Sequence, residues 1–163
     1  MQIKKIESTY KVHSSLETID DVSRQLLQKA KDACERAYAN YSNFKVGAAL
    51  LMEDGEIIEG NNQENAAYPS GMCAERVAVF YASSKYPHKK IKAIAITAQS
   101  KLHFAGLPVT PCGACRQVMS EFEVKQQENI RLFLSGESKE VWELESAAQL
   151  LPLSFGADRL KPI

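Results

Sequence analysis

The chain has 163 residues, which is enough for one domain with a sizeable core and too few for two comfortable ones. Twenty basic residues balance twenty acidic ones, so the charge gives no support for nucleic acid or a membrane surface as a partner. The N-terminus lacks the apolar core of a signal peptide, and no apolar run approaches membrane-spanning length. We therefore expect a cytoplasmic protein whose four cysteines stay reduced.

The first part of the chain predicts an arm followed by a helix. We expect one domain over residues 1–163, in which residues 1–17 form an N-terminal arm or edge strand without an assigned role. Thr18 and Asp21 have the spacing of a capping box, and apolar residues then recur on one helical face. A helix is therefore expected directly after the arm.

The remaining elements alternate between strands and helices. Residues 46–60 predict a β-hairpin, because Asp54 and Gly55 form a favoured turn pair between two apolar runs. After a polar loop come a helix over 73–83, a strand over 91–98, a helix over 110–122, a strand over 130–136 and a short helix over 146–151. This order favours an α/β fold with helices on both faces of the sheet, antiparallel at the hairpin and parallel where helices cross over.

Three of the cysteines stand at the starts of two predicted helices. Cys112 and Cys115 belong to a P-C-x-x-C motif, and residues three apart lie close to one face of a helix. Cys73 begins the other helix, and a helix N-terminus favours thiolate over thiol. Three convergent thiolates are a soft tetrahedral zinc environment with one position open. Alternatively, a fourth ligand such as His103 would make the zinc structural, or the thiols are unrelated buried residues.

Charged residues beside these cysteines complete a candidate site. Glu75 follows Cys73 by two residues and can move protons for a water at the open zinc position. Arg76 and Arg116 each follow a candidate ligand closely and can donate hydrogen bonds to thiolate sulfur, which reduces the excess negative charge on the metal. In the plainer interpretation, the glutamate only complements the helix dipole and the arginines form surface ion pairs.

Four further segments of the chain are YSNFKVGAALL, GNNQENAAYPSGMCAERVA, PCGACRQV and LLPLSFG. Together, and in this order, they resemble the small homotetrameric cytidine deaminases. The resemblance runs from about residue 20 to residue 160. It implies a three-layer α/β/α sandwich with a mixed five-stranded sheet and one Zn²⁺ per subunit. It also implies hydrolysis of cytidine and deoxycytidine to uridine and deoxyuridine, with release of ammonia, in pyrimidine salvage.

The resemblance assigns roles to individual residues. It makes Cys73, Cys112 and Cys115 the zinc ligands and Glu75 the catalytic acid and base. The family's substrate contacts fall on seven positions. Asn62 and Glu64 correspond to the residues at the ribose 3′-hydroxyl, and the backbone of Ala66 and Ala74 to the groups at the edge of the base. Phe44 corresponds to the aromatic beside the pyrimidine, and Tyr68 and Phe155 to residues that reach into a neighbouring subunit's pocket. No monomer would then hold a complete site. The chain departs from the family in its long arm and at Lys45, where proline is frequent.

Three alternatives stay open on sequence alone. A deaminase of another aminopyrimidine nucleoside, of the blasticidin S type, shares the CAE and PCGxCRQ segments, although the N-x-E-N stretch and LLPLSFG favour cytidine. A polynucleotide cytosine deaminase is disfavoured by the zero net charge. A non-catalytic zinc module with four protein ligands belongs to a different class, and an assay for loss of the 4-amino group separates it from the enzymes.

Overall fold

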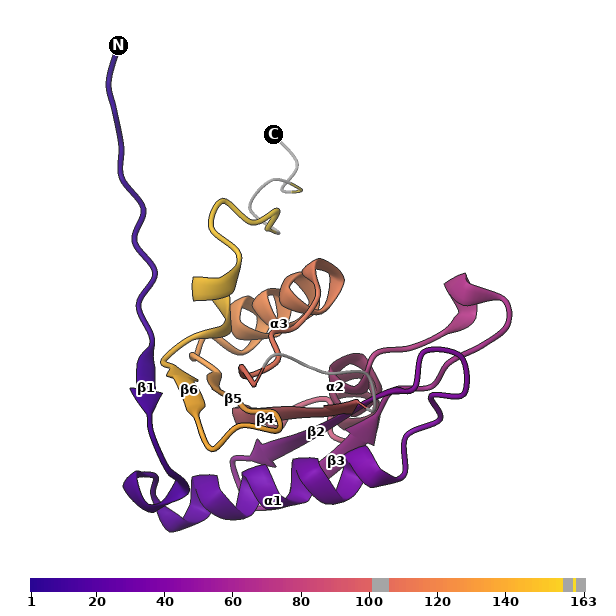
Figure 1. Ribbon diagram of the computed structural model, residues 1–163. Helices are drawn as coiled ribbons and strands as arrows, with labels where there is room; N and C mark the ends of the chain where they lie inside the picture. Colours follow the sequence, from indigo (N-terminus) through magenta and orange to yellow (C-terminus); the bar gives the residue numbers. More distant parts are fainter. Residues whose placement is uncertain (101–105, 157–159, 161–163) are drawn as a thin grey trace.

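The computed structural model describes residues 1–100, 106–156 and 160 (Figure 1). Within these ranges one sheet has the strand order β1-β6-β5-β4-β2-β3. Its strands are β1 (Lys11–His13), β2 (Phe44–Met52), β3 (Ile57–Asn61), β4 (Ile91–Ser100), β5 (Arg131–Leu134) and β6 (Val141–Leu144). The helices are α1 (Asp21–Glu35), α2 (Ala74–Lys85) and α3 (Gly113–Gln126), with short 3-10 turns at η1 (Leu16–Thr18), η2 (Tyr68–Ser70) and η3 (Ala147–Leu150). None of the described helices is both long and apolar enough to cross a membrane.

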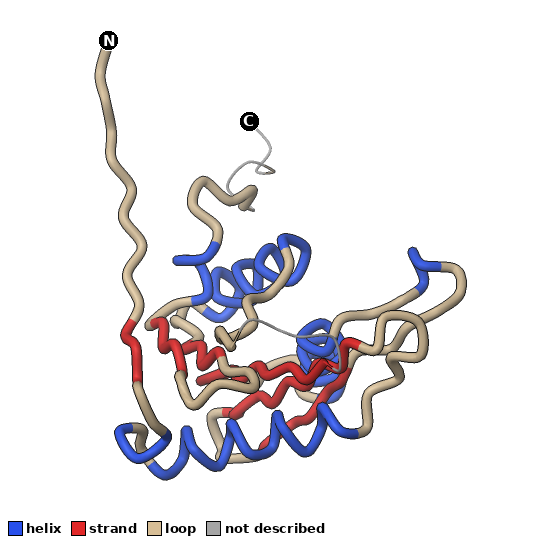
Figure 2. Tube along the Cα trace, viewed as in Figure 1, coloured by secondary structure: helices blue, strands red, loops and turns tan. Residues whose placement is uncertain are grey.

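Helices cover both faces of the sheet. Figures 1 and 2 show α1 along one face, with α2 and α3 over the other. The buried side chains divide in the same way. Leu26 of α1 packs with Phe133 of the sheet in one cluster. In the other, Val79 of α2 and Met119 of α3 pack with Ile94. The three-layer α/β/α sandwich expected from the sequence is therefore confirmed.

Within the described residues the sheet has six strands rather than the expected five, and β1 forms one edge of it. This strand lies in the segment expected to form an arm or an edge strand, and it pairs antiparallel with β6 so that Val12 lies opposite Trp142. The residue pattern did not predict β6. Its four residues are too few to show a period, and Glu143 occupies a buried position within it.

Local chemistry sets where α1 begins and how it sits on the sheet. Asp20 caps the helix, because its Oδ1 accepts a hydrogen bond from the Ser23 backbone N–H at 2.9 Å. Thr18, the expected cap, lies in η1 instead. α1 comes close to β2 at Gly47, where a Cβ would lie 2.0 Å from the Ala30 carbonyl oxygen. Only glycine permits this approach.

The chain connections bring two helix starts to one edge of the sheet. The predicted hairpin is confirmed as β2 and β3. β3 and β4 are both antiparallel to β2, so they point the same way, and β5 is parallel to β4. α2 connects β3 to β4, and α3 connects β4 to β5. Because both helices follow strands of the same direction, both begin beyond the same carboxyl-terminal edge.

Candidate metal centre and active site

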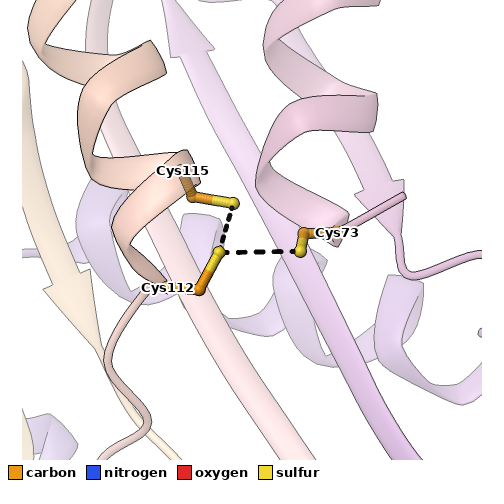
Figure 3. Close-up of side chains that lie close together, drawn as sticks. All are labelled: Cys73, Cys112 and Cys115. Atoms are coloured by element: carbon orange, nitrogen blue, oxygen red, sulfur yellow. Dashed lines mark hydrogen bonds between the residues drawn. The ribbon is translucent and has the colours of Figure 1, made fainter. Parts of the chain in front are cut away.

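Three cysteine side chains converge where α2 and α3 begin (Figure 3). Cys73 directly precedes α2, Cys112 directly precedes α3, and Cys115 lies in the first turn of α3. The Sγ atom of Cys112 is 3.8 Å from that of Cys73 and 3.4 Å from that of Cys115. All three sulfurs lie within 4.8 Å of one another. Neither N-cap cysteine uses its side chain to cap its helix, so both sulfurs can face a common ligand.

A glycine in β3 lets the start of α2 approach the sheet. A Cβ on Gly60 would lie 2.6 Å from the carbonyl oxygen of Ala74 and 2.7 Å from the backbone nitrogen of Ala78. Any other residue would push the helix away from β3. This contact therefore seats the turn that carries Cys73 and Glu75.

The sulfur geometry fits a tetrahedral zinc ion. Zn–S bonds of about 2.3 Å in a tetrahedron place two sulfurs about 3.8 Å apart, close to the observed 3.8 and 3.4 Å. Thiolates also favour zinc over magnesium or calcium. Among the described residues no histidine or carboxylate joins the three cysteines, and His103 lies outside those residues. The cluster therefore supplies three protein ligands, the number that catalytic zinc sites use.

The cluster favours a thiolate at Cys73. A hydrogen bond from Cys115 lowers the pKa of Cys73 to about 5; burial opposes this shift, and a hydrogen bond from Arg76 supports it. The pKa of Cys115 is raised, because its proton is held by the Cys73 sulfur and because the thiol is buried. A metal ion replaces such shared protons, so metal affinity increases with pH.

The two arginines singled out from the sequence have different partners. Arg76 Nη2 lies 3.6 Å from Cys73 Sγ and can donate a hydrogen bond to it. Arg116 donates from Nε to the Pro111 carbonyl oxygen at 2.8 Å and from Nη1 to the Leu150 carbonyl oxygen at 3.0 Å. Arg76 therefore contacts a sulfur, whereas Arg116 ties the start of α3 to the end of η3.

Glu75 is buried in the first turn of α2, with 4% of its surface exposed. Burial raises the pKa of its carboxyl group; its own backbone N–H opposes the shift, and the charge on Cys73 supports it. A raised pKa makes a carboxylate a better proton acceptor, which is what a general base needs. Glu75 therefore combines the place and the acidity that a proton carrier at this cluster needs.

The two residues expected at the ribose both bind the segment that leads into β2. The Asn62 side chain bonds to the β2 backbone, and its Nδ2 donates to the Phe44 carbonyl oxygen at 2.9 Å. The Glu64 carboxylate accepts hydrogen bonds from the Tyr41 backbone N–H at 2.8 Å and from the Ser42 hydroxyl. The bond from Ser42 lowers the pKa of Glu64. These contacts fix the start of β2, where Phe44 lies, and the loop before it.

The other expected substrate contacts range from buried to fully exposed. Ala74 is buried at the start of α2, Phe44 is half-buried at the start of β2, and Ala66 is exposed in the loop before α2. Tyr68 is 77% exposed and Phe155 is 60% exposed. Aromatic side chains this exposed are candidates for contact with another molecule.

Two residues of α3 that were not singled out from the sequence hold the C-terminal segment. Gln117 Nε2 donates to the Phe155 carbonyl oxygen at 2.8 Å. Gln117 lies within the PCGACRQV segment, which is the signal that could have found it. The carboxylate of Glu123 is buried and carries no such signal. It accepts four hydrogen bonds, from the backbone N–H groups of Ile130, Ala147 and Ala148 and the hydroxyl of Ser146.

The fold and the site together define a class of protein: an α/β sandwich in which two helix starts bring together three cysteines that fit a zinc ion, beside a buried carboxylate. The chain matches the family model described as the cytidine and deoxycytidylate deaminase zinc-binding region over residues 20–128, and it belongs to that family.

Similar proteins agree with this assignment. A cytidine deaminase from Halalkalibacterium halodurans is 43% identical over 135 residues, which cover 83% of this chain and 95% of the relative. One from Sporosarcina psychrophila is 43% identical over 136 residues, covering 83% and 93%. The crystal structure of cytidine deaminase from Burkholderia pseudomallei has a TM-score of 0.70 at 41% identity, covering 80% of this chain and 97% of that one. The resemblance drawn from the four sequence segments is confirmed.

Proposed function

We propose that this chain hydrolyses cytidine and deoxycytidine to uridine and deoxyuridine, with release of ammonia, as a zinc enzyme. The observation that carries the proposal is the cluster of Cys73, Cys112 and Cys115 with Glu75 buried beside it. Zinc deaminases use three such ligands and a glutamate that is not a ligand. The similarity to proteins named cytidine deaminase favours a nucleoside as substrate.

Glu75 moves the protons in the proposed reaction. Cys73, Cys112 and Cys115 would hold the zinc ion, which would act as a Lewis acid and lower the pKa of a bound water. Glu75 takes one proton from the attacking water and gives it to N3 of the cytosine ring while the water oxygen bonds to C4. It then carries the second proton from the new C4 hydroxyl to the 4-amino group. The C4–N bond breaks and ammonia leaves. The raised pKa of the buried carboxyl suits both transfers.

The arginines act on the ligands in this proposal. Three thiolates place much negative charge on the metal and weaken it as a Lewis acid. A hydrogen bond from Arg76 to Cys73 withdraws part of that charge. Arg116 supports Cys112 indirectly, because it binds the carbonyl oxygen of the preceding Pro111.

The proposed ribose contacts, Asn62 and Glu64, lie against the start of β2 and the loop before it. We assign Asn62 and Glu64 to the ribose 3′-hydroxyl, Phe44 to the pyrimidine face, and the backbone of Ala66 and Ala74 to the edge of the base. Hydrogen bonds already hold Asn62 and Glu64 in place, so little side-chain freedom is lost when nucleoside binds. The binding energy can then be used to orient the ring.

The chain is proposed to work in the cytoplasm as one domain over residues 1–163, assembled as a homotetramer. Tyr68 and Phe155 complete the pocket of a neighbouring subunit in this arrangement, and their exposure supports the assignment.

An ultraviolet assay for loss of the 4-amino group tests the function. Zinc-loaded protein is given cytidine, deoxycytidine, blasticidin S, free cytosine and single-stranded DNA in parallel. We expect turnover of the two cytosine nucleosides and none of DNA. Turnover of blasticidin S alone would support the alternative nucleoside deaminase, and no turnover at all would support a non-catalytic zinc module.

A further inference from the structure

The N-terminal segment reaches beyond the body of the protein. Residues 8–13 of this segment contact the domain. The strand β1 pairs with β6, and the Tyr10 ring centre lies 5.0 Å from that of Trp142. The Ser8 hydroxyl donates a hydrogen bond to the Gln149 carbonyl oxygen at 2.6 Å. Figure 1 shows the preceding residues continuing from β1 as an extended chain that leaves the domain.

The distal part of this segment, residues 1–7, is exposed and unpaired. Ile3 is 86% exposed and Ile6 is 55% exposed. No hydrogen bond joins the backbone of residues 1–7 to the rest of the described chain. The ion pair between Lys5 and Glu7 stays within the segment itself. An extended chain with free backbone groups and apolar side chains is a template for pairing with another strand.

The charge pattern favours a second copy of the same segment as that strand. In an antiparallel pair centred on Ile6, the two Ile6 side chains lie opposite each other and Lys5 lies opposite Glu7 twice. Lys4 lies opposite Ser8, so no like charges meet. A parallel pair in register would place each lysine opposite its own copy, which is unfavourable. Of these two in-register arrangements, only the antiparallel one places opposite charges against each other, and it does so twice.

We propose that residues 2–10 of two copies of this chain pair as antiparallel strands centred on Ile6. The contact is a two-fold one, in which the same residues serve both copies. It lies at the β1 edge of the sheet, which the described strands leave open. This contact uses none of the residues assigned to deamination, so the proposed pairing and the proposed function can be tested independently.

Cross-linking tests the register of this pair. Ile6→Cys in the zinc-loaded full chain should form a disulfide-linked dimer under mild diamide oxidation, seen on a non-reducing gel. Lys4→Cys is the matched control on the same face of the segment. Two copies of residue 4 would lie four positions apart, about 13 Å, which is too far for a disulfide. The unsubstituted chain gives the background from the native cysteines. Equal cross-linking of the two variants would overturn the proposed register.

Charge reversal tests whether the segment recognises itself. In the Ile6→Cys chain, Lys5→Glu or Glu7→Lys alone places like charges opposite each other twice. Each change should raise the protein concentration needed for half-maximal cross-linking about tenfold. The double change Lys5→Glu with Glu7→Lys restores opposite charges and should restore cross-linking. If the double variant cross-links as weakly as the single ones, the segment does not pair with itself.

Discussion

Glu75 is a buried acid, and burying a charged carboxylate costs several kcal/mol unless it is paired. The same burial raises the pKa of Glu75, since desolvation disfavours the charged form of the carboxyl group. The same raised pKa suits a group that accepts and returns protons. The proposed proton transfer therefore accounts for the place of this acid at the start of an apolar helix.

Replacing Glu75 should remove the reaction but keep the metal. Glu75→Gln preserves shape and cannot carry a proton, so kcat should fall at least about 10²-fold. Zinc content, measured on the same sample, should stay at one ion per chain. Glu53→Gln, an exposed residue of the β2–β3 turn, is the control and should behave as the unsubstituted chain. Turnover retained by Glu75→Gln would remove the proton-carrier role.

Arg76 should tune the metal centre. Arg76→Gln loses the donor to Cys73 Sγ, and zinc affinity or turnover should fall about 10- to 100-fold. Competition with a chelator measures the affinity. Arg24→Gln changes a half-exposed arginine on α1 and should leave the affinity unchanged. Equal zinc affinity and equal turnover for Arg76→Gln would show that the hydrogen bond to sulfur has no part in the site.

Residue spacing predicted part of this site and not the rest. The convergence of Cys112 and Cys115 follows from helical periodicity, which acts over three residues. The contact of Arg116 with Leu150 spans 34 residues and uses a backbone acceptor. A carbonyl oxygen has no sequence signature, so this contact could not be predicted from residue types.

At the scale of elements, the site depends on how closely α2 lies against β3. Gly60→Ala places a Cβ 2.6 Å from the Ala74 carbonyl oxygen, so α2 must shift. The free energy of unfolding should fall by about 1–3 kcal/mol, measured by urea titration, and turnover should fall with it. Gly113→Ala is the control for stability, because nothing lies within 4 Å of its Cβ. A Gly60→Ala chain as stable as the Gly113→Ala chain would contradict this close packing.

The edge formed by β1 and β6 depends on one buried carboxylate. Glu143 accepts hydrogen bonds from Arg131 at 2.9 Å and His13 at 2.8 Å. Burial alone raises the pKa of Glu143, but the bonds from Arg131 and His13 outweigh it and lower the pKa below its ordinary 4.5. Its stabilisation is therefore complete above pH 4.5 and is lost as the pH falls through the lowered value.

The contacts of Glu143 predict how the free energy of unfolding depends on pH. Glu143→Gln should lower the free energy of unfolding by about 1–2 kcal/mol at neutral pH, because it removes the charge that pairs with Arg131, while Arg131 itself is 42% exposed and screened by solvent. The difference from the unsubstituted chain should shrink as the pH falls below 4.5. Glu145→Gln removes an exposed partner of Lys11 and should cost less than about 1 kcal/mol. A Glu143→Gln difference that does not change with pH would contradict the role of the charge.

The elements predicted most accurately were those with long periodic patterns, such as α1 and the β2–β3 hairpin. An edge strand was one of the two expectations for residues 1–17, but its bounds and its pairing with β6 could not be predicted, because the three residues of β1 carry no period. The strand β1 forms because β6 offers an unpaired edge and because Lys11 and His13 meet Glu143 there. Both causes lie about 130 residues away along the chain, beyond the reach of any local pattern.

At the scale of the whole molecule, the proposed tetramer predicts that two inactive variants restore each other. Glu75→Gln lacks the proton carrier but keeps Phe155, whereas Phe155→Ala lacks the aromatic but keeps the carrier. If Phe155 acts in a neighbour's pocket, an equal mixture after subunit exchange should regain about a quarter of the sites. Light scattering on the same samples gives the assembly mass. No recovery from a mixture that has exchanged subunits would place Phe155 outside the neighbour's site.

The measurement that tests the central claim most directly is cytidine turnover as a function of zinc bound per chain. Metal-free protein is reloaded in steps, with bound zinc and uridine formation measured on each sample. Turnover should rise in proportion to bound zinc and stop rising at one ion per chain, and Cys112→Ser should lose both. Full turnover without metal, or a fully loaded chain that leaves cytidine unchanged, would contradict the account.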